Sequence, residues 1–213
     1  MEPIGSFLSD QRLKHAELQD YIIDIIYDRI QPDALLYGGT AIWRCFGGTR
    51  FSEGIDIYLD SSAFEELLSV LEKYGISLAW QDPDMPTRIR LSRSSTDILL
   101  ETKPGHAENE IHTYYRIDGS TKTINVLSPT ELMIRKIEAY QGRRFIRDIY
   151  DLYVLTNWLN KSDYTVKSRL SNFLQDIASP VDEKVLSSLL YAELKNLNFT
   201  IMVNFIRRLL GEI

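Results

Sequence analysis

The chain has 213 residues, enough for one sizeable domain or for two small ones that share a core. Hydrophobic residues make up 44% and charged residues 25%, as in an ordinary globular protein, and no window holds the roughly 18 apolar residues that a membrane span needs. The formal net charge of −6 argues against a protein that coats nucleic acid over its whole surface. Cys45 is the only cysteine, so no internal disulfide can form, and with no leader-like start we expect a cytoplasmic protein.

The first half of the chain reads as a mixture of helices and short strands. A helix is expected over residues 10–30, because its apolar residues recur at the spacing of one buried stripe and Pro32 ends it. A second helix is expected to run to Lys73, with Ser62 and Glu65 forming a capping box near its start. Seven apolar or alternating runs bounded by turn residues are the expected strands: 34–37, 55–59, 76–80, 87–91, 97–103, 111–117 and 121–126.

From Ser128 onward the pattern is helical. In "SPTE", residues 128–131, a serine can cap a helix whose first position suits proline and whose third position suits glutamate. This helix is expected to end near Tyr140 with Gly142 at its C′ position, and later ones should begin near residue 145, at residues 179–180 and at residue 199. The predicted organisation is an α/β core with an N-terminal helix over residues 1–127, and a helical C-terminal part over residues 128–213 that packs on the core.

A glycine turn followed by an acidic strand points to nucleotidyl transfer. Gly38, Gly39 and Thr40 follow a short strand and open a helix, and the backbone N–H groups of such a turn can cradle a triphosphate. The transfer itself needs Mg²⁺ ions that are held by carboxylates, and two carboxylates at positions i and i+2 of a strand point to the same face. The strand after the turn supplies Asp56.

A further carboxylate from a neighbouring strand would complete the metal cage. The run "DILLETK", residues 97–103, places Asp97 and Glu101 on one strand face. Either side chain is a candidate metal ligand together with Asp56, and we prefer Glu101, which has the more apolar setting.

Two stretches resemble a known family in the expected order. "YGGTAIWRCFGGTRFSEGIDIYLD", residues 37–60, resembles the first motif of the AbiEii nucleotidyltransferase-like toxin family: Gly-Gly-Thr-Ala, a loop ending in Arg-x-Ser, and then Asp-x-Asp. "TELMIRKIEAYQGRRFIRDIYDLYVL", residues 130–155, resembles its later motifs, in which a lysine precedes an Arg-Asp-x-x-Asp-Leu segment. The resemblance covers roughly residues 30–160.

This resemblance implies an α+β protein, with a DNA-polymerase-β-like nucleotidyltransferase fold built on a mixed sheet and a helical C-terminal part. It implies Mg²⁺ as cofactor, an NTP as substrate, and an RNA acceptor such as the 3′ end of tRNA. It also implies the toxin half of a toxin–antitoxin system, with the antitoxin as a separate protein. The candidate catalytic residues are Asp56 and Glu101, which the strand pattern indicates, together with Lys136 and Asp148, which the resemblance implies. The implied nucleotide-binding residues are Gly38, Gly39, Thr40, Arg50, Ser52 and Lys136.

Each of these residues also has a structural interpretation. Thr40 could cap a helix, and Arg50 and Ser52 could belong to an ordinary polar loop. Glu101 could pair with a lysine or arginine across the sheet, and Lys136 could be a surface lysine. Asp56 could be a strand-end carboxylate in solvent.

The later motif lies in a basic segment. Five cations fall within residues 135–147 and Glu138 is the only acid among them, which is typical either of a solvated helix face or of a local anion-binding face. Asp148 could orient Lys136, take part in catalysis, or form a surface pattern with Arg147.

The chain departs from the family pattern at Gly54, where the motif asks for aspartate. Asp60 shares a face with Asp56, but it lies roughly 13 Å along the strand, too far to bridge two metal ions. Three explanations stay open: an inactivated variant of a toxin that would poison its producing cell, a natural variant that transfers poorly, or a bulge that turns Glu53 into the slot. The competing functions are a catalytically degenerate module that binds a nucleotide or an antitoxin, and a small-molecule nucleotidyltransferase on the same fold.

Overall fold

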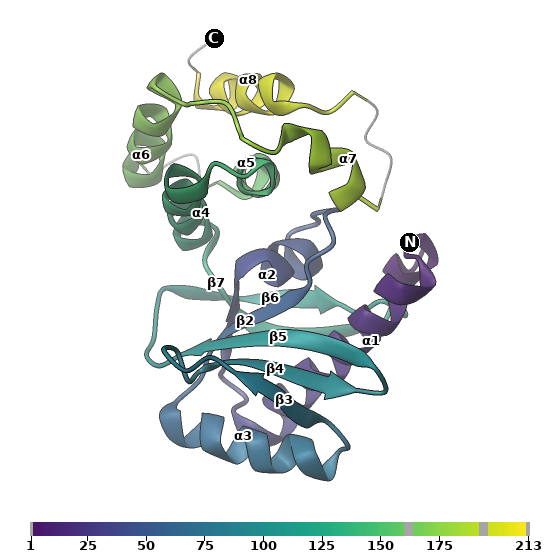
Figure 1. Ribbon diagram of the computed structural model, residues 1–213. Coiled ribbons are helices and arrows are strands. Elements are labelled where there is room, and N and C mark those ends of the chain that lie inside the picture. The colour runs from purple at the N-terminus through teal and green to yellow at the C-terminus, as the bar shows by residue number, and fades with distance from the viewer. Residues whose placement is uncertain (1, 160–163, 192–195, 212–213) are drawn as a thin grey trace. The chain divides into compact units, whose positions relative to one another are not determined.

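The computed structural model describes residues 2–159, 164–191 and 196–211 (Figure 1). The chain divides into two compact units. Unit 1 consists of Met1–Cys45 and Phe51–Leu127, and unit 2 of Phe46–Arg50 and Ser128–Ile213. Unit 1 mixes strands and helices and unit 2 is helical, so the α+β class expected from the sequence is confirmed.

Unit 1 is built on a seven-stranded mixed sheet with the order β3-β4-β5-β2-β1-β7-β6. All seven expected strands are confirmed: β1 Leu35–Tyr37, β2 Gly54–Tyr58, β3 Ser77–Gln81, β4 Arg88–Arg93, β5 Thr96–Lys103, β6 Asn109–Tyr115 and β7 Thr121–Leu127. At the centre, β2 runs antiparallel to β1 and parallel to β5. Side chains alternate along β2 and β5, so one face carries Ile55, Ile57 and Leu100 into the core and the opposite face carries Asp56 and Glu101.

Three helices belong to the sheet unit (Figure 1): α1 Asp10–Ile25, α2 Gly38–Cys45 and α3 Ser61–Lys73. A π-helical turn, Ile26–Ile30, continues α1, so the helix expected over residues 10–30 is confirmed. The capping box expected at Ser62 and Glu65 is wrong, because α3 already begins at Ser61, with Asp60 at its N-cap position.

Unit 2 contains α4 Pro129–Arg143, α5 Ile146–Leu155, α6 Tyr164–Gln175, α7 Leu186–Leu189 and α8 Phe199–Leu210. The Ser128 cap is confirmed, because its hydroxyl accepts a hydrogen bond from Glu131 N at 3.3 Å. The C′ role predicted for Gly142 is wrong: α4 runs on to Arg143, and Arg144 takes the left-handed conformation at φ 53° with its N–H on Tyr140 O.

Two further differences concern the end of the chain. No helix starts at residues 179–180. Instead, the segment leads to a 3₁₀ turn at Glu183–Val185, and the Asp182 carboxylate accepts a hydrogen bond from Ile146 N at 2.6 Å. The helix α6 was not predicted, whereas the starts of α5 and α8 were.

Candidate active site

The glycine turn and Asp56 are in direct contact within unit 1. Gly38 has a φ of 73°, and a Cβ placed on it would lie 2.0 Å from Asp56 Oδ2. Both the backbone conformation and the space therefore require glycine there. Tyr37, at the end of β1, pairs with Asp56 on β2, and this register brings the carboxylate against the turn.

Glu101 lies beside Asp56 on the same face of the sheet. The two residues are register partners on the parallel strands β2 and β5, whose backbones are about 4.8 Å apart. Lys103 Nζ lies 3.5 Å from Glu101 Oε1, and Arg88 Nε lies 4.0 Å from Oε2. The cross-strand pairing considered for Glu101 is thus present, and it leaves the carboxylate 24% exposed next to Asp56.

Asp97 is not brought to this place. It is exposed, it pairs with Ser92 on β4, and four strand residues separate it from Glu101, a distance of roughly 13 Å. The prediction that Asp97 shares a metal ion with Asp56 is therefore wrong, because the register of β2 and β5 places Glu101, and not Asp97, beside Asp56.

Gly54 occupies the slot that the family motif gives to aspartate. It faces the same side as Asp56, and β2 pairs regularly with β5 from Gly54 to Tyr58. With no bulge in that pairing, Glu53 is exposed on the other side, and the idea that it fills the slot is wrong. Among the residues that the structure describes, no group of three acidic, histidine or cysteine side chains could hold a metal. Asp56 and Glu101 alone therefore do not fit a complete two-Mg²⁺ cage.

Thr40 has a structural role. It is fully buried inside α2, and its hydroxyl donates to Gly54 O at 2.5 Å, which ties α2 to β2. This hydroxyl is not placed to donate to a phosphate, and the residue is not a helix cap, because α2 begins at Gly38. Ser52 is also buried, and Gln19 Nε2 donates to its carbonyl at 2.7 Å. What the turn offers a phosphate is the backbone N–H groups of Gly38 and Gly39 in the first turn of α2.

Lys136 lies in a buried ionic network of unit 2. Its Nζ lies 2.6 Å from Asp151 Oδ2 and 3.6 Å from Asp148 Oδ1. Arg50 donates through Nε and Nη2 to the two oxygens of Asp151, both at 2.9 Å. Asp148 likewise accepts two bonds from Arg143, both at 2.8 Å. We call these five residues the ionic network.

Electrostatics keeps the network charged. Burial raises the pKa of Asp151, but the charges of Arg50 and Lys136 outweigh that effect and bring the pKa below its ordinary value. For Arg50, burial lowers the pKa and Asp151 more than restores it. The charges of Arg50 and Lys136 are thus neutralised by Asp151. Both side chains are held in place by this carboxylate, which favours a structural role over the triphosphate binding expected from the sequence. Asp148 contacts Lys136 as the orienting role requires, and it is fully buried between two cations.

A family model described as nucleotidyl transferase AbiEii toxin, type IV toxin–antitoxin system, matches residues 25–205. The chain belongs to the AbiEii family. Among solved structures, JHP933 from Helicobacter pylori is 21% identical with a TM-score of 0.62, over 96% of this chain and 92% of that one. ANT(2″)-Ia in complex with adenylyl-2″-tobramycin is 15% identical with a TM-score of 0.52, over 78% and 99%. No functionally curated protein sequence matches significantly.

These similarities establish the nucleotidyltransferase fold for this AbiEii protein. In the part of the chain that the structure describes, no helix is long and apolar enough to cross a membrane.

Asp151 is the central carboxylate of the ionic network, and sequence analysis left it without a role. The family's Arg-Asp-x-x-Asp-Leu motif contains it, and the three-residue spacing from Asp148 places both carboxylates on one side of α5. That spacing was the available signal. The partner Arg50 could not be found in the same way, because it lies 101 residues away in the sequence.

Proposed function

We propose that this AbiEii-family chain is a cytoplasmic toxin that transfers nucleotides from an NTP to an RNA acceptor such as the 3′ end of tRNA. Mg²⁺ is the cofactor implied for this reaction, and a separate antitoxin protein is the implied partner. The observation that carries the proposal is the pair Asp56 and Glu101, register partners on parallel strands, with Asp56 held against the Gly38 turn.

The chain's own groups support this chemistry in two ways. The backbone N–H groups in the first turn of α2 suit the anionic phosphates of an NTP. The Asp56 carboxylate beside them supplies the hard oxygen ligands that a divalent cation prefers. A bound cation would supply charge neutralisation and alignment of the reacting oxygens.

Gly54 leaves this arrangement short of one carboxylate, and we propose that it impairs transfer. The backbone around it is intact: its carbonyl accepts hydrogen bonds from Thr40 and from Gln19. A Cβ at this position would lie 3.3 Å from Leu99 O, so a side chain there requires the Leu99 carbonyl to move by a few tenths of an ångström. The site therefore lacks only the carboxylate side chain at position 54, while the backbone that would carry it is in place.

The test is Gly54→Asp, assayed by transfer of radiolabelled NTP to tRNA with Mg²⁺. Gly54→Asn is the matched control, because it adds nearly the same volume without the charge. We expect the aspartate variant to gain roughly 10- to 1,000-fold over the present chain and the asparagine variant to gain little. No gain in the aspartate variant would count heavily against the proposal. Labelling of an aminoglycoside in place of tRNA would favour the small-molecule alternative.

A further inference from the structure

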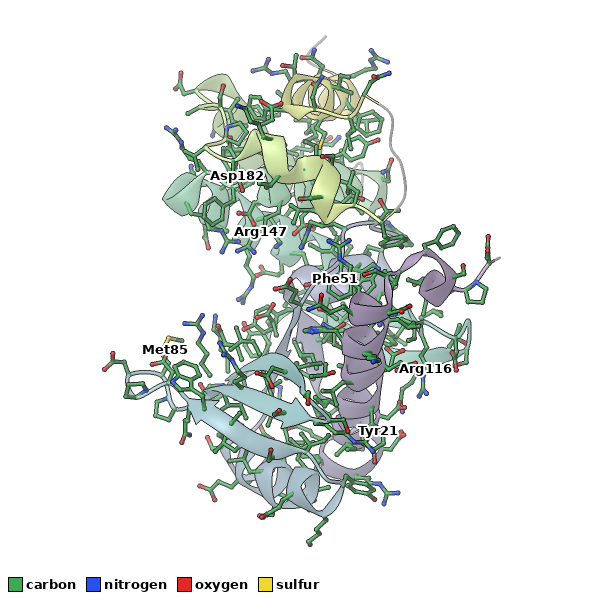
Figure 2. The ribbon with its side chains drawn as sticks, turned by 45° about the vertical axis from the view of Figure 1, so that its right-hand side comes forward. Tyr21, Phe51, Met85, Arg116, Arg147 and Asp182 are labelled. Atoms are coloured by element: carbon green, nitrogen blue, oxygen red, sulfur yellow. The ribbon has the colours of Figure 1, made fainter. Side chains whose placement is uncertain are left out.

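Arg147 is held on an aromatic ring at the start of α5. The guanidinium of Arg147 lies 5.4 Å from the centre of the Phe145 ring, and that of Arg143 lies 5.5 Å from the same centre. Such contacts orient a planar guanidinium without using its hydrogen-bond donors. Arg147, labelled in Figure 2, is half-buried, so its position is defined by packing and not only by solvent.

Arg147 differs from the three cations of the ionic network in having no carboxylate within salt-bridge distance. Lys136, Arg50 and Arg143 each contact a carboxylate of the ionic network. Within the described part of the chain, no carboxylate oxygen lies within 4.0 Å of Arg147, and its Nε is buried without a hydrogen-bond partner. Burial, together with the nearby charge of Arg143, lowers the pKa of Arg147. A guanidinium kept in such surroundings costs free energy, and an unsatisfied buried donor calls for an explanation.

The surroundings of Arg147 carry an excess of positive charge. Arg50 and the segment 135–151 contain six cations and three acids, a balance of +3 in a chain whose total is −6. Asp182 is also nearby, but its carboxylate accepts a hydrogen bond from Ile146 N. Arg144 is exposed next to this group. The formal charges of the rest of the chain sum to −9, the total of −6 less the +3 of this group. An anionic ligand would therefore favour this corner between α4 and α5.

We propose that Arg147, held by the Phe145 ring beside Arg143, binds a backbone phosphate of the acceptor RNA. This inference rests on the proposed function, and it adds a binding residue in unit 2. The planar guanidinium matches phosphate oxygens through paired N–H donors. Because Arg143 and Arg144 are exposed, the corner is an open surface, which suits an extended polyanion better than a single nucleotide.

The experiment measures RNA binding by the full chain without NTP. A fluorescent RNA hairpin with a single-stranded 3′ end is titrated at several salt concentrations, and anisotropy gives the Kd. Arg147→Gln is compared with Arg208→Gln, an equal charge change at an exposed position of α8. We expect Arg147→Gln to raise the Kd roughly tenfold and to reduce the salt slope by about 0.7 to 0.9, the loss of one phosphate contact. Arg208→Gln should change the Kd less than about twofold and leave the slope unchanged.

Arg147→Lys provides a second variant, because it keeps the charge and loses the paired donors. It should retain the salt slope and bind more weakly than the parent chain. Equal Kd values for the two glutamine variants would overturn the inference and leave the proposed function standing. A variant that binds RNA normally but loses affinity for a non-hydrolysable NTP analogue would overturn the assignment to RNA. A parent chain that binds no RNA even at low salt would overturn both.

Discussion

The substitution Asp151→Asn tests whether the ionic network holds unit 2 together. Asp151 is 1% exposed, and its oxygens accept bonds from Arg50 and Lys136 at 2.6 to 2.9 Å. Asparagine keeps the size but removes the charge, and its amide group donates where a carboxylate oxygen accepted. Arg50 and Lys136 then lose their nearest carboxylate, and Lys136 keeps the longer contact with Asp148 at 3.6 Å.

The expected loss of stability is about 3–5 kcal/mol, the range for removing one partner of a buried ion pair. For a chain of this length, each kcal/mol lowers the melting temperature by about 2–4 °C, so the midpoint should fall by roughly 6–20 °C. Thermal unfolding followed by circular dichroism measures this shift. Asp176→Asn is the control: this aspartate is exposed at the end of α6, and its replacement should change stability by less than about 0.5 kcal/mol.

The same variant has a predicted pH dependence. The pKa of Asp151 lies below its ordinary value in the folded chain, so its stabilising contribution is present above the unfolded pKa of about 3.9 and is lost as pH falls through the folded pKa. The stability difference between the parent and Asp151→Asn should therefore shrink below about pH 4. A loss under about 1 kcal/mol at pH 7, or a difference that grows in acid, would refute the reasoning.

Two further predictions concern unit 1. Gly38→Ala should cost about 2 kcal/mol or more, because alanine is strained at a φ of 73° and its Cβ would lie 2.0 Å from Asp56 Oδ2. Urea unfolding measures this loss of stability. The control is Gly142→Ala in α4, where a Cβ meets no atom within 4 Å, and it should be neutral or stabilising. Equal losses in the two variants would contradict the steric role of Gly38. Burial raises the pKa of the Cys45 thiol, so iodoacetamide should label this residue only when the chain unfolds. Mass spectrometry measures the labelling, and full labelling of the native protein at pH 8 would disprove the prediction.

Much of the fold was predictable because its signals are local. Alternating runs predicted all seven strands, and a serine–proline start predicted α4. The failures lie where a distant contact outweighed a local preference. Arg144, not Gly142, adopts the left-handed conformation at the end of α4, and its carbonyl accepts a hydrogen bond from the distant Val181 N at 3.0 Å. Asp182 binds the first N–H of α5 where the sequence around residue 180 suggested a new helix.

The candidate site divides in the same way. The Gly-Gly-Thr turn, Asp56 and the vacancy at Gly54 are visible in one short stretch, and so is the family to which they point. The choice of Glu101 over Asp97 required the register of β2 and β5. The structural role of Thr40, predicted to bind phosphate, became evident only from the hydrogen bond of its buried hydroxyl to Gly54 O.

By itself, the sequence determined the element types, the glycine turn and the missing carboxylate, since each depends on residues that are neighbours in the chain. The tertiary structure alone decided which charges meet, as with Arg50 and Asp151, which lie 101 residues apart. Coulombic attraction and burial depend on distances in space. The order of residues in the sequence does not show which cation is buried next to which carboxylate. The same reason explains why Arg147, although next to Asp148 in the chain, forms no salt bridge in the described structure, whereas Arg143 pairs with that carboxylate.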